Sequence, residues 1–170
     1  TADYAFTSAG VQDGDDISTQ EWNGLTWALG CNLITGRNGV GSGGTKDANA
    51  GLIVGGQNTD EVTCTEEYTK NFIPPYTTTV WAGGAAVITA RGEAAGTGTQ
   101  NAGLFFGGVT PTVVACTEEF DGTSFSVGGA LITAVRIVGG FGATQDASVK
   151  AGGFLSPTRR NTTEEYNGTS

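Results

Sequence analysis

The most regular feature of the chain is a set of short apolar segments that end in paired glycines. Leu52-Ile53-Val54 is followed by Gly55-Gly56, and Leu104-Phe105-Phe106 is followed by Gly107-Gly108. Runs this short, rich in aliphatic and aromatic residues and bounded by glycine, predict buried β-strands rather than helices. No apolar stripe of helical period persists along the chain, so we expect an all-β fold.

A polar motif with an aromatic end repeats in phase with these segments. It reads Thr65-Glu66-Glu67-Tyr68, Thr117-Glu118-Glu119-Phe120 and Thr163-Glu164-Glu165-Tyr166, with a weaker copy at Thr19-Gln20-Glu21-Trp22. The four copies are 46, 52 and 46 residues apart. A period of this size is typical of one supersecondary unit that stacks on its neighbours because it cannot bury its apolar face alone.

Other positions recur in the same register. A second aromatic residue recurs at Trp27, Trp81 and Phe125. An aliphatic-Ile-Thr triplet follows it, and then an arginine: Arg37, Arg91 or Arg136. A stretch of small residues, a polar turn and the apolar segment complete the unit. Each unit therefore predicts four short antiparallel strands, of which the first is made of small residues and the last carries the second aromatic.

These residues resemble the kelch-repeat family of β-propellers. The likeness rests on the paired glycines after an apolar strand, the aromatics Tyr68 and Phe120, the second aromatics Trp81 and Phe125, and the arginine that follows. It implies four-stranded antiparallel blades, whose innermost strands are small because blades converge at the axis. The phrase Thr163-Glu164-Glu165-Tyr166-Asn167-Gly168 looks more particularly like the kelch-like arrays of marine bacteriophages, which are virion or tail-fibre proteins.

The register of the repeat divides the chain into four blades. We expect a partial blade at 1–30 without its inner strand, complete blades at 31–82 and 83–127, and a partial blade at 128–170 with an incomplete outer strand. Open strand edges invite pairing with another chain. The register thus predicts that further sequence or a partner subunit completes the array, with a self-closed four-bladed ring as the alternative.

One unit contains an insertion between Tyr68 and Trp81. The segment includes Pro74-Pro75-Tyr76 and should project as an enlarged loop. Phe72 and Tyr76 within it are candidates for stacking on a sugar ring or anchoring a protein partner. Local packing at the end of the blade is the other interpretation of these two aromatics.

Charge and composition argue against several classes of function. The net charge is -9, with eight Lys and Arg residues among 170, which argues against binding nucleic acid or an anionic membrane. No apolar run approaches the roughly 20 residues that span a bilayer. The chain has no histidine, the commonest general base and zinc ligand. We therefore expect no enzymatic activity, no cofactor and no catalytic residue.

The paired glutamates are the residues that most resemble catalytic groups. Neighbouring residues on a strand point to opposite faces, so each pair is split rather than convergent. Repetition in every unit favours a scaffold role, in which one Glu of each pair bonds to a repeated arginine. The residues predicted to hold the blades together are Glu67, Glu119, Glu165, Arg37, Arg91, Arg136, Trp27, Trp81 and Phe125.

Two other patterns suggest ligands only weakly. Asp13, Asp15 and Asp16 offer carboxylates to calcium, but their spacing does not fit an EF-hand and a solvated turn explains them as well. The glycine-rich stretch 41–44 precedes a hairpin rather than a helix, which argues against nucleotide binding.

The sequence thus predicts a non-catalytic structural or binding propeller module. The resemblance implies a virion-associated or extracellular protein that contributes to assembly or host-surface attachment through other protein subunits or a surface glycan. One alternative is a lectin-type propeller with one weak sugar site per blade. Another is a fragment of a larger propeller enzyme.

Overall fold

The chain is all-β, as the sequence predicts. A computed structural model describes residues 5–8, 17–22, 24–44, 49–73 and 76–169, with the backbone only for 5–8, 71–73 and 76–78. Its strands are β1 (Ala5–Ser8), β2 (Thr19–Trp22), β3 (Trp27–Leu29), β4 (Gly41–Gly44), β5 (Ala50–Val54), β6 (Thr65–Ile73), β7 (Tyr76–Gly83), β8 (Ala95–Thr99), β9 (Ala102–Phe106), β10 (Val109–Thr110), β11 (Thr112–Val113), β12 (Thr117–Phe120), β13 (Phe125–Val127), β14 (Gly139–Thr144), β15 (Ala147–Ala151), β16 (Phe154–Leu155), β17 (Thr158–Arg159) and β18 (Thr163–Tyr166). No helix in the described part of the chain is long and apolar enough to cross a membrane.

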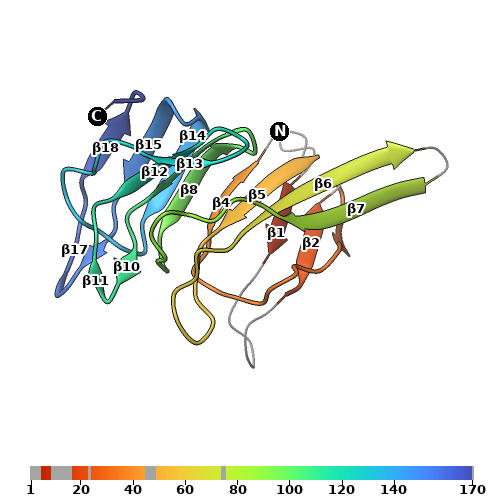
Figure 1. Cartoon of the computed structure of the whole chain (residues 1–170), viewed down its shortest axis with the longest axis horizontal. Helices are drawn as coiled ribbons and strands as arrows, with labels where there is room; N and C mark the ends of the chain where they lie inside the picture. The colour runs from red at the N-terminus through yellow and green to blue at the C-terminus, as the bar shows by residue number, and fades with distance from the viewer. Residues whose placement is uncertain (1–4, 9–16, 23, 45–48, 74–75, 170) are drawn as a thin grey trace.

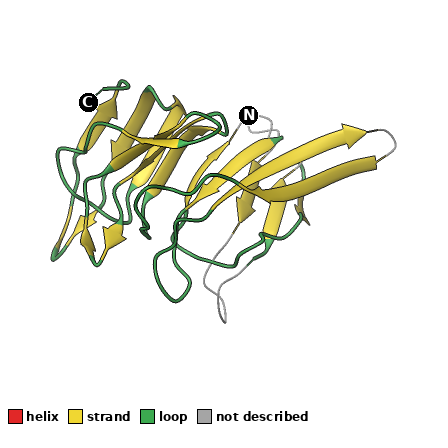
Figure 2. Cartoon of the chain, viewed as in Figure 1, coloured by secondary structure: helices red, strands yellow, loops and turns green. Residues whose placement is uncertain are grey.

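Figure 2 shows the described chain as strands joined by loops. Most of the strands form four antiparallel sheets, which follow one another along the chain. The first sheet has the order β1-β2-β3, the second β4-β5-β6-β7, the third β8-β9-β12-β13, and the fourth β14-β15-β18. Two small hairpins, β10-β11 and β16-β17, complete the described strands. The repeated sequence unit thus corresponds to one sheet, and sequence neighbours pair within it.

The sheets pack face to face, and the core lies between them (Figure 1). Leu52 and Val54 of the second sheet contact Phe105 and Phe120 of the third. Because β5 and β9 are covered on both faces, their apolar residues run without alternation, as the sequence pattern does.

Strands β4 and β8, the first strands of the second and third sheets, approach each other closely enough to favour small residues. A Cβ atom added to Gly96 would lie 2.5 Å from the backbone nitrogen of Ser42, and one added to Gly43 would lie 3.2 Å from the carbonyl oxygen of Thr97. The small residues of β4, β8 and β14 therefore reflect the spacing of the sheets.

Gly107 and Gly108 end β9 with φ angles of 65° and 104°, values that side chains rarely adopt. This turn lets the Gly108 nitrogen donate to the carbonyl oxygen of Val135, 2.8 Å away, in the segment that leads to the fourth sheet. Gly56 donates in the same way to Arg91, at 3.1 Å. These two glycine pairs thus join the second unit to the third and the third unit to the fourth.

The insertion in the second unit forms an extended hairpin instead of the enlarged loop expected from the sequence. The last pair between β5 and β6 is Ala50 with Thr69, but β6 and β7 continue to pair as far as Ile73 with Tyr76. The hairpin therefore projects beyond the rest of its sheet (Figure 1).

Candidate functional site

The first glutamate of the repeated motif is a buried carboxylate that joins a sheet to the segment preceding it. Glu66 accepts hydrogen bonds from the backbone nitrogens of Ile34 at 2.7 Å and Thr35 at 3.1 Å. Arg37 donates from Nη1 to the same carboxylate at 2.6 Å, and both side chains are buried. Two amides and one guanidinium thus compensate the charge of Glu66.

The third sheet repeats this arrangement. Glu118 accepts from the backbone nitrogens of Ile88 at 2.7 Å and Thr89 at 3.1 Å, and from Nη1 of Arg91. Arg91 also donates from Nη2 to the carbonyl oxygen of Phe105 at 3.1 Å, and its guanidinium lies 4.2 Å from the centre of the Phe105 ring. The expectation that one Glu of each pair bonds to the repeated arginine is therefore met in two sheets by the first Glu.

The fourth sheet keeps the carboxylate but takes its cation from another position. Glu164 accepts from the backbone nitrogen of Ile132 at 2.7 Å and from Nζ of Lys150 at 3.2 Å. Arg136 instead pairs with Glu93 at 2.7 Å, where both side chains are 30% exposed. The predicted equivalence of Arg136 with Arg37 and Arg91 is wrong.

An extra residue explains this difference. One residue separates Thr35 from Arg37 and Thr89 from Arg91, whereas two separate Thr133 from Arg136. Fully buried Val135 therefore occupies the position that Arg91 holds in the third unit. The hydrogen bonds agree, because Gly108 donates to the carbonyl oxygen of Val135 as Gly56 donates to that of Arg91. Lys150 lies opposite Glu164 where Phe105 lies opposite Glu118, so the cation has moved from the connecting segment to the strand. Sequence reasoning missed Lys150, although the longer spacing was a visible signal.

The second glutamate of the motif points forward, to the sheet that follows. Glu21 accepts from the Tyr68 hydroxyl at 2.6 Å and from Nζ of Lys70 at 2.7 Å, and Glu119 accepts from the Tyr166 hydroxyl. In the third sheet the position of Tyr68 and Tyr166 is held by Phe120, which has no hydroxyl, and Glu67 accepts from Nε2 of Gln100 at 2.9 Å instead. These three carboxylates form the polar part of the junctions between sheets, which agrees with the scaffold role predicted for Glu67 and Glu119.

Glu165 is the exception among these carboxylates. It holds the same position in the fourth sheet as Glu67 and Glu119, opposite Val149, and its side chain is exposed. No sheet of the described chain follows the fourth one.

The junctions raise the pKa of the two tyrosines. Burial, and then the hydrogen bond to the Glu21 carboxylate, raise the pKa of Tyr68 far above its usual range. Burial, and then the hydrogen bond to Glu119, also raise the pKa of Tyr166. The Tyr68 phenol therefore stays protonated and donates to the Glu21 carboxylate. This hydrogen bond links the second sheet to the first and has a structural role.

The second aromatics support the first ones. Trp81 lies with its ring centre 5.3 Å from that of Tyr68, and Phe125 lies 4.7 Å from Phe120. Trp27 forms the same pair with Trp22 at 5.6 Å, but it is 50% exposed whereas Trp81 is 8% exposed. The structural role expected for these aromatics holds for Trp81 and Phe125, which pack in the interior.

The candidate contact residues Phe72 and Tyr76 lie in the projecting hairpin, in β6 and β7. Their side chains lie outside the described part of the structure, as do all atoms of Asp13, Asp15 and Asp16. In the described residues, no group of three or more His, Cys, Asp and Glu side chains could hold a metal ion.

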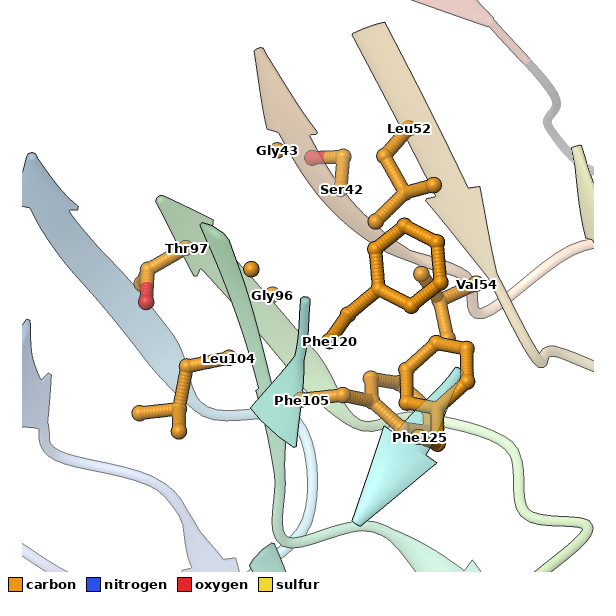
Figure 3. A pocket seen from close by; sticks show the side chains of 11 residues that line it. Ser42, Gly43, Leu52, Val54, Gly96, Thr97, Leu104, Phe105, Phe120 and Phe125 are labelled. Carbon is orange, nitrogen blue, oxygen red and sulfur yellow. The ribbon is translucent and has the colours of Figure 1, made fainter. Parts of the chain in front are cut away.

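Two cavities between the sheets in the described part of the chain are too small for a ligand. Apolar residues and glycines of the second and third sheets enclose about 10 Å³, including Leu52, Phe105, Phe120 and Phe125 (Figure 3). A second cavity between the third and fourth sheets encloses about 20 Å³. Volumes of this size hold one water molecule at most.

A hollow of about 300 Å³ lies at the β16-β17 hairpin and is lined by Ile137, Gly153, Phe154, Arg159 and Arg160. Gly152-Gly153 is the pair equivalent to Gly55-Gly56 and Gly107-Gly108. At those two pairs the connecting segment of the next sheet lies against the glycines. The hollow thus corresponds to a position that the repeat fills elsewhere in the chain.

Comparison with known proteins supports the fold alone. No family model and no curated protein sequence matches the chain. A solved structure, that of the protein YjhT, is similar with a TM-score of 0.71 at 10% sequence identity, over 87% of this chain and 48% of that chain. The chain therefore spans about half the length of the structure it matches.

Proposed function

We propose that this chain is part of a kelch-like β-propeller that acts as a non-catalytic binding module. Face-to-face sheets with closely spaced inner strands support the propeller arrangement, and the fold likeness to YjhT is compatible with it. In this proposal each sheet is a blade. The module contributes to assembly or host attachment on a virion or another extracellular surface, where its partners are protein subunits or a surface glycan.

The role of the motif carboxylates supports a non-catalytic function. Glu66 and Glu118 are buried and hold backbone amides and an arginine, while Glu67 and Glu119 bind donors from the next sheet. A general acid or base must reach a substrate atom, within hydrogen-bonding distance or through one water. Carboxylates occupied in this way serve the scaffold.

The projecting hairpin of β6 and β7 is the observation that carries the proposal. Its pairs from Lys70 with Thr79 to Ile73 with Tyr76 lie beyond the last pair that β6 makes with β5. Binding residues are often displayed on a projection held by a rigid scaffold. In this proposal the hairpin, which contains Phe72 and Tyr76 in β6 and β7, is the part of the module that meets a partner.

Removal of the hairpin tip tests this function. Replacing residues 71–78 with a short Asn-Gly turn leaves every pair between β5 and β6 in place. We expect the shortened protein to lose binding to bacterial cells and to an array of bacterial surface polysaccharides. Replacing Thr110-Pro111-Thr112 of the β10-β11 hairpin by Asn-Gly is the matched control and should retain binding. Unchanged binding after tip removal, or hydrolysis of the arrayed polysaccharides by the intact protein, would contradict the proposal.

A further inference from the structure

Strand β7 forms a long and regular outer edge of the second sheet. The order β4-β5-β6-β7 places it beside β6 alone in the described part of the chain. It has eight residues, whereas β3 and β13, which hold the same place in the first and third sheets, have three each. Its pairing with β6 runs from Glu66 with Gly83 to Ile73 with Tyr76 without a register shift.

This edge lacks the features that usually keep a sheet edge from pairing with another strand. Such features are a short strand, charged side chains, proline or a bulge. β7 contains no charged residue and no proline, and four of its eight residues are β-branched, which suits an extended strand. One of them, Val80, is 49% exposed. The edge of β7 can therefore accept a further strand.

Neighbouring sheets of the array do not cover an edge of this kind. The third sheet packs against the second on one side and the fourth on the other. Its outer strand β13 nevertheless stays open, because Ser126 and Val127 are exposed. Sheets of this array pack on faces, so further sheets of the same chain would leave the edge of β7 open as well.

The projecting part of the hairpin is where an added strand stabilises most. Its pairs run from Lys70 with Thr79 to Ile73 with Tyr76, beyond the last pair that β6 makes with β5 (Figure 1). Two antiparallel strands alone are marginally stable in water, and three or more are needed for a stable sheet. A strand added along residues 76–80 would meet this need.

The residue types of this segment match a second copy of themselves. When two β7 strands run antiparallel about their middle, Thr78 lies opposite Thr78 of the second copy, and Thr77 lies opposite Thr79. Tyr76 lies opposite Val80. Thr–Thr pairs and pairs of an aromatic with a β-branched residue are favourable between strands. No charge on β7 meets its own copy, although the protein carries a net charge of -9.

We propose that two copies of this chain pair through the β7 strands of their projecting hairpins. The pairing is antiparallel and centred on Thr78, so the two hairpins form one four-stranded sheet with the order β6-β7-β7-β6. Both copies use the same surface, so the contact closes at a dimer. The pairing needs no other ligand and does not depend on what the hairpin binds.

Sedimentation velocity of the intact protein over a wide range of concentrations tests the proposal. We expect a monomer–dimer equilibrium and no larger species. Thr78→Lys and Thr78→Glu each place two like charges opposite each other at the centre of the contact. Each should weaken dimerisation by more than about tenfold.

The same two substitutions at Thr112 are the matched controls. Thr112 is an exposed residue of β11, which belongs to a different hairpin. Thr112→Lys and Thr112→Glu should therefore dimerise like the unmodified protein. Circular dichroism confirms that each variant is folded.

A mixture of Thr78→Lys and Thr78→Glu gives the sharper result. Opposite charges now face each other at the centre, so we expect a 1:1 heterodimer at concentrations where each variant alone is monomeric. An unmodified protein that stays monomeric at every concentration would overturn the proposal. Folded Thr78 variants that dimerise as strongly as the unmodified protein, or a mixture that stays as monomeric as its components, would overturn it too.

Discussion

The third and fourth sheets each compensate the charge of a buried glutamate, but they take the cation from different positions. In the third, Arg91 from the connecting segment binds Glu118, and Phe105 covers the guanidinium. In the fourth, Val135 takes the place of the arginine, and Lys150 binds Glu164 from the strand position of Phe105. A carboxylate removed from water needs a cation and hydrogen-bond donors. The comparison indicates that the repeat requires a cation at this point in space and not an arginine at one place in the sequence.

The largest expected effect comes from removing the cation of the third sheet. Arg91→Met leaves Glu118 buried and uncompensated, so we expect the free energy of unfolding to fall by about 3 to 5 kcal/mol in urea denaturation. Arg136→Met is the matched control, because its pair with Glu93 is partly exposed. It should cost about 1 kcal/mol or less. Equal losses in the two variants would show that Arg91 and Arg136 are equivalent after all.

A smaller effect is expected at the tyrosines that join the sheets. Tyr68→Phe removes the bond to Glu21 and should cost about 1.5 kcal/mol, the lower end for a hydrogen bond to a charged group. Tyr166→Phe should cost less, because Tyr166 is only half-buried whereas Tyr68 is fully buried. Urea denaturation at neutral pH measures both, and a larger loss for Tyr166→Phe would contradict this difference between the interior and the fourth sheet.

The raised pKa of Tyr68 predicts how the free energy of unfolding changes at alkaline pH. The folded protein raises the pKa of Tyr68 above the unfolded value of 10.0. The stability that this shift represents is complete below pH 10 and is lost as the pH rises beyond it. We expect Tyr68→Phe to lose less stability than the unmodified protein between neutral and alkaline pH. Parallel curves for the two proteins would show that the phenol is not protected by folding.

The smallest effect concerns an exposed turn that differs between the same two sheets. Asp121 accepts from the backbone nitrogens of Thr123 and Ser124, both at 2.8 Å, and these bonds lower its pKa below 3.8. Asn167 accepts from Thr169 at the equivalent turn of the fourth sheet, without a charge. The stability from Asp121 is present above the unfolded pKa and is lost as the pH falls through the folded one. Asp121→Asn should therefore flatten the acid limb of stability slightly, whereas an unchanged limb would assign no stabilisation to this carboxylate.

The sequence predicts the strands well because each of them follows a local rule. The apolar segments before Gly55 and Gly107, the small residues of β4 and β8, and the Thr-Glu-Glu strands all lie where the period places them. The sequence also predicts where the insertion lies, but it predicts a loop where the structure has an extended hairpin. Whether a segment with Pro74-Pro75 makes a loop or extends two strands depends on cross-strand pairing that sequence spacing does not specify.

The partners of the carboxylates were harder to predict. Alternation predicts that Glu66 and Glu67 diverge, and their partners agree. The alternation of side chains along the strand does not predict which of the two glutamates pairs with Arg37. That depends on the face of the sheet against which the connecting segment packs. Lys150 was missed for a similar reason: a lysine in an apolar strand is explained only when the loss of an arginine at Val135 is seen in space.

The buried carboxylate of the fourth sheet should accept its cation from either of the two positions, and a double-mutant cycle in that sheet measures this. Lys150→Phe removes the cation, Val135→Arg adds it at the position used by the third sheet, and the double variant transplants the arrangement of Arg91 and Phe105. We expect Lys150→Phe alone to cost about 3 kcal/mol, and the double variant to recover at least about 1 kcal/mol of it as coupling. A double variant whose loss of unfolding free energy equals the sum of the two single losses would show that the two cation positions are not interchangeable.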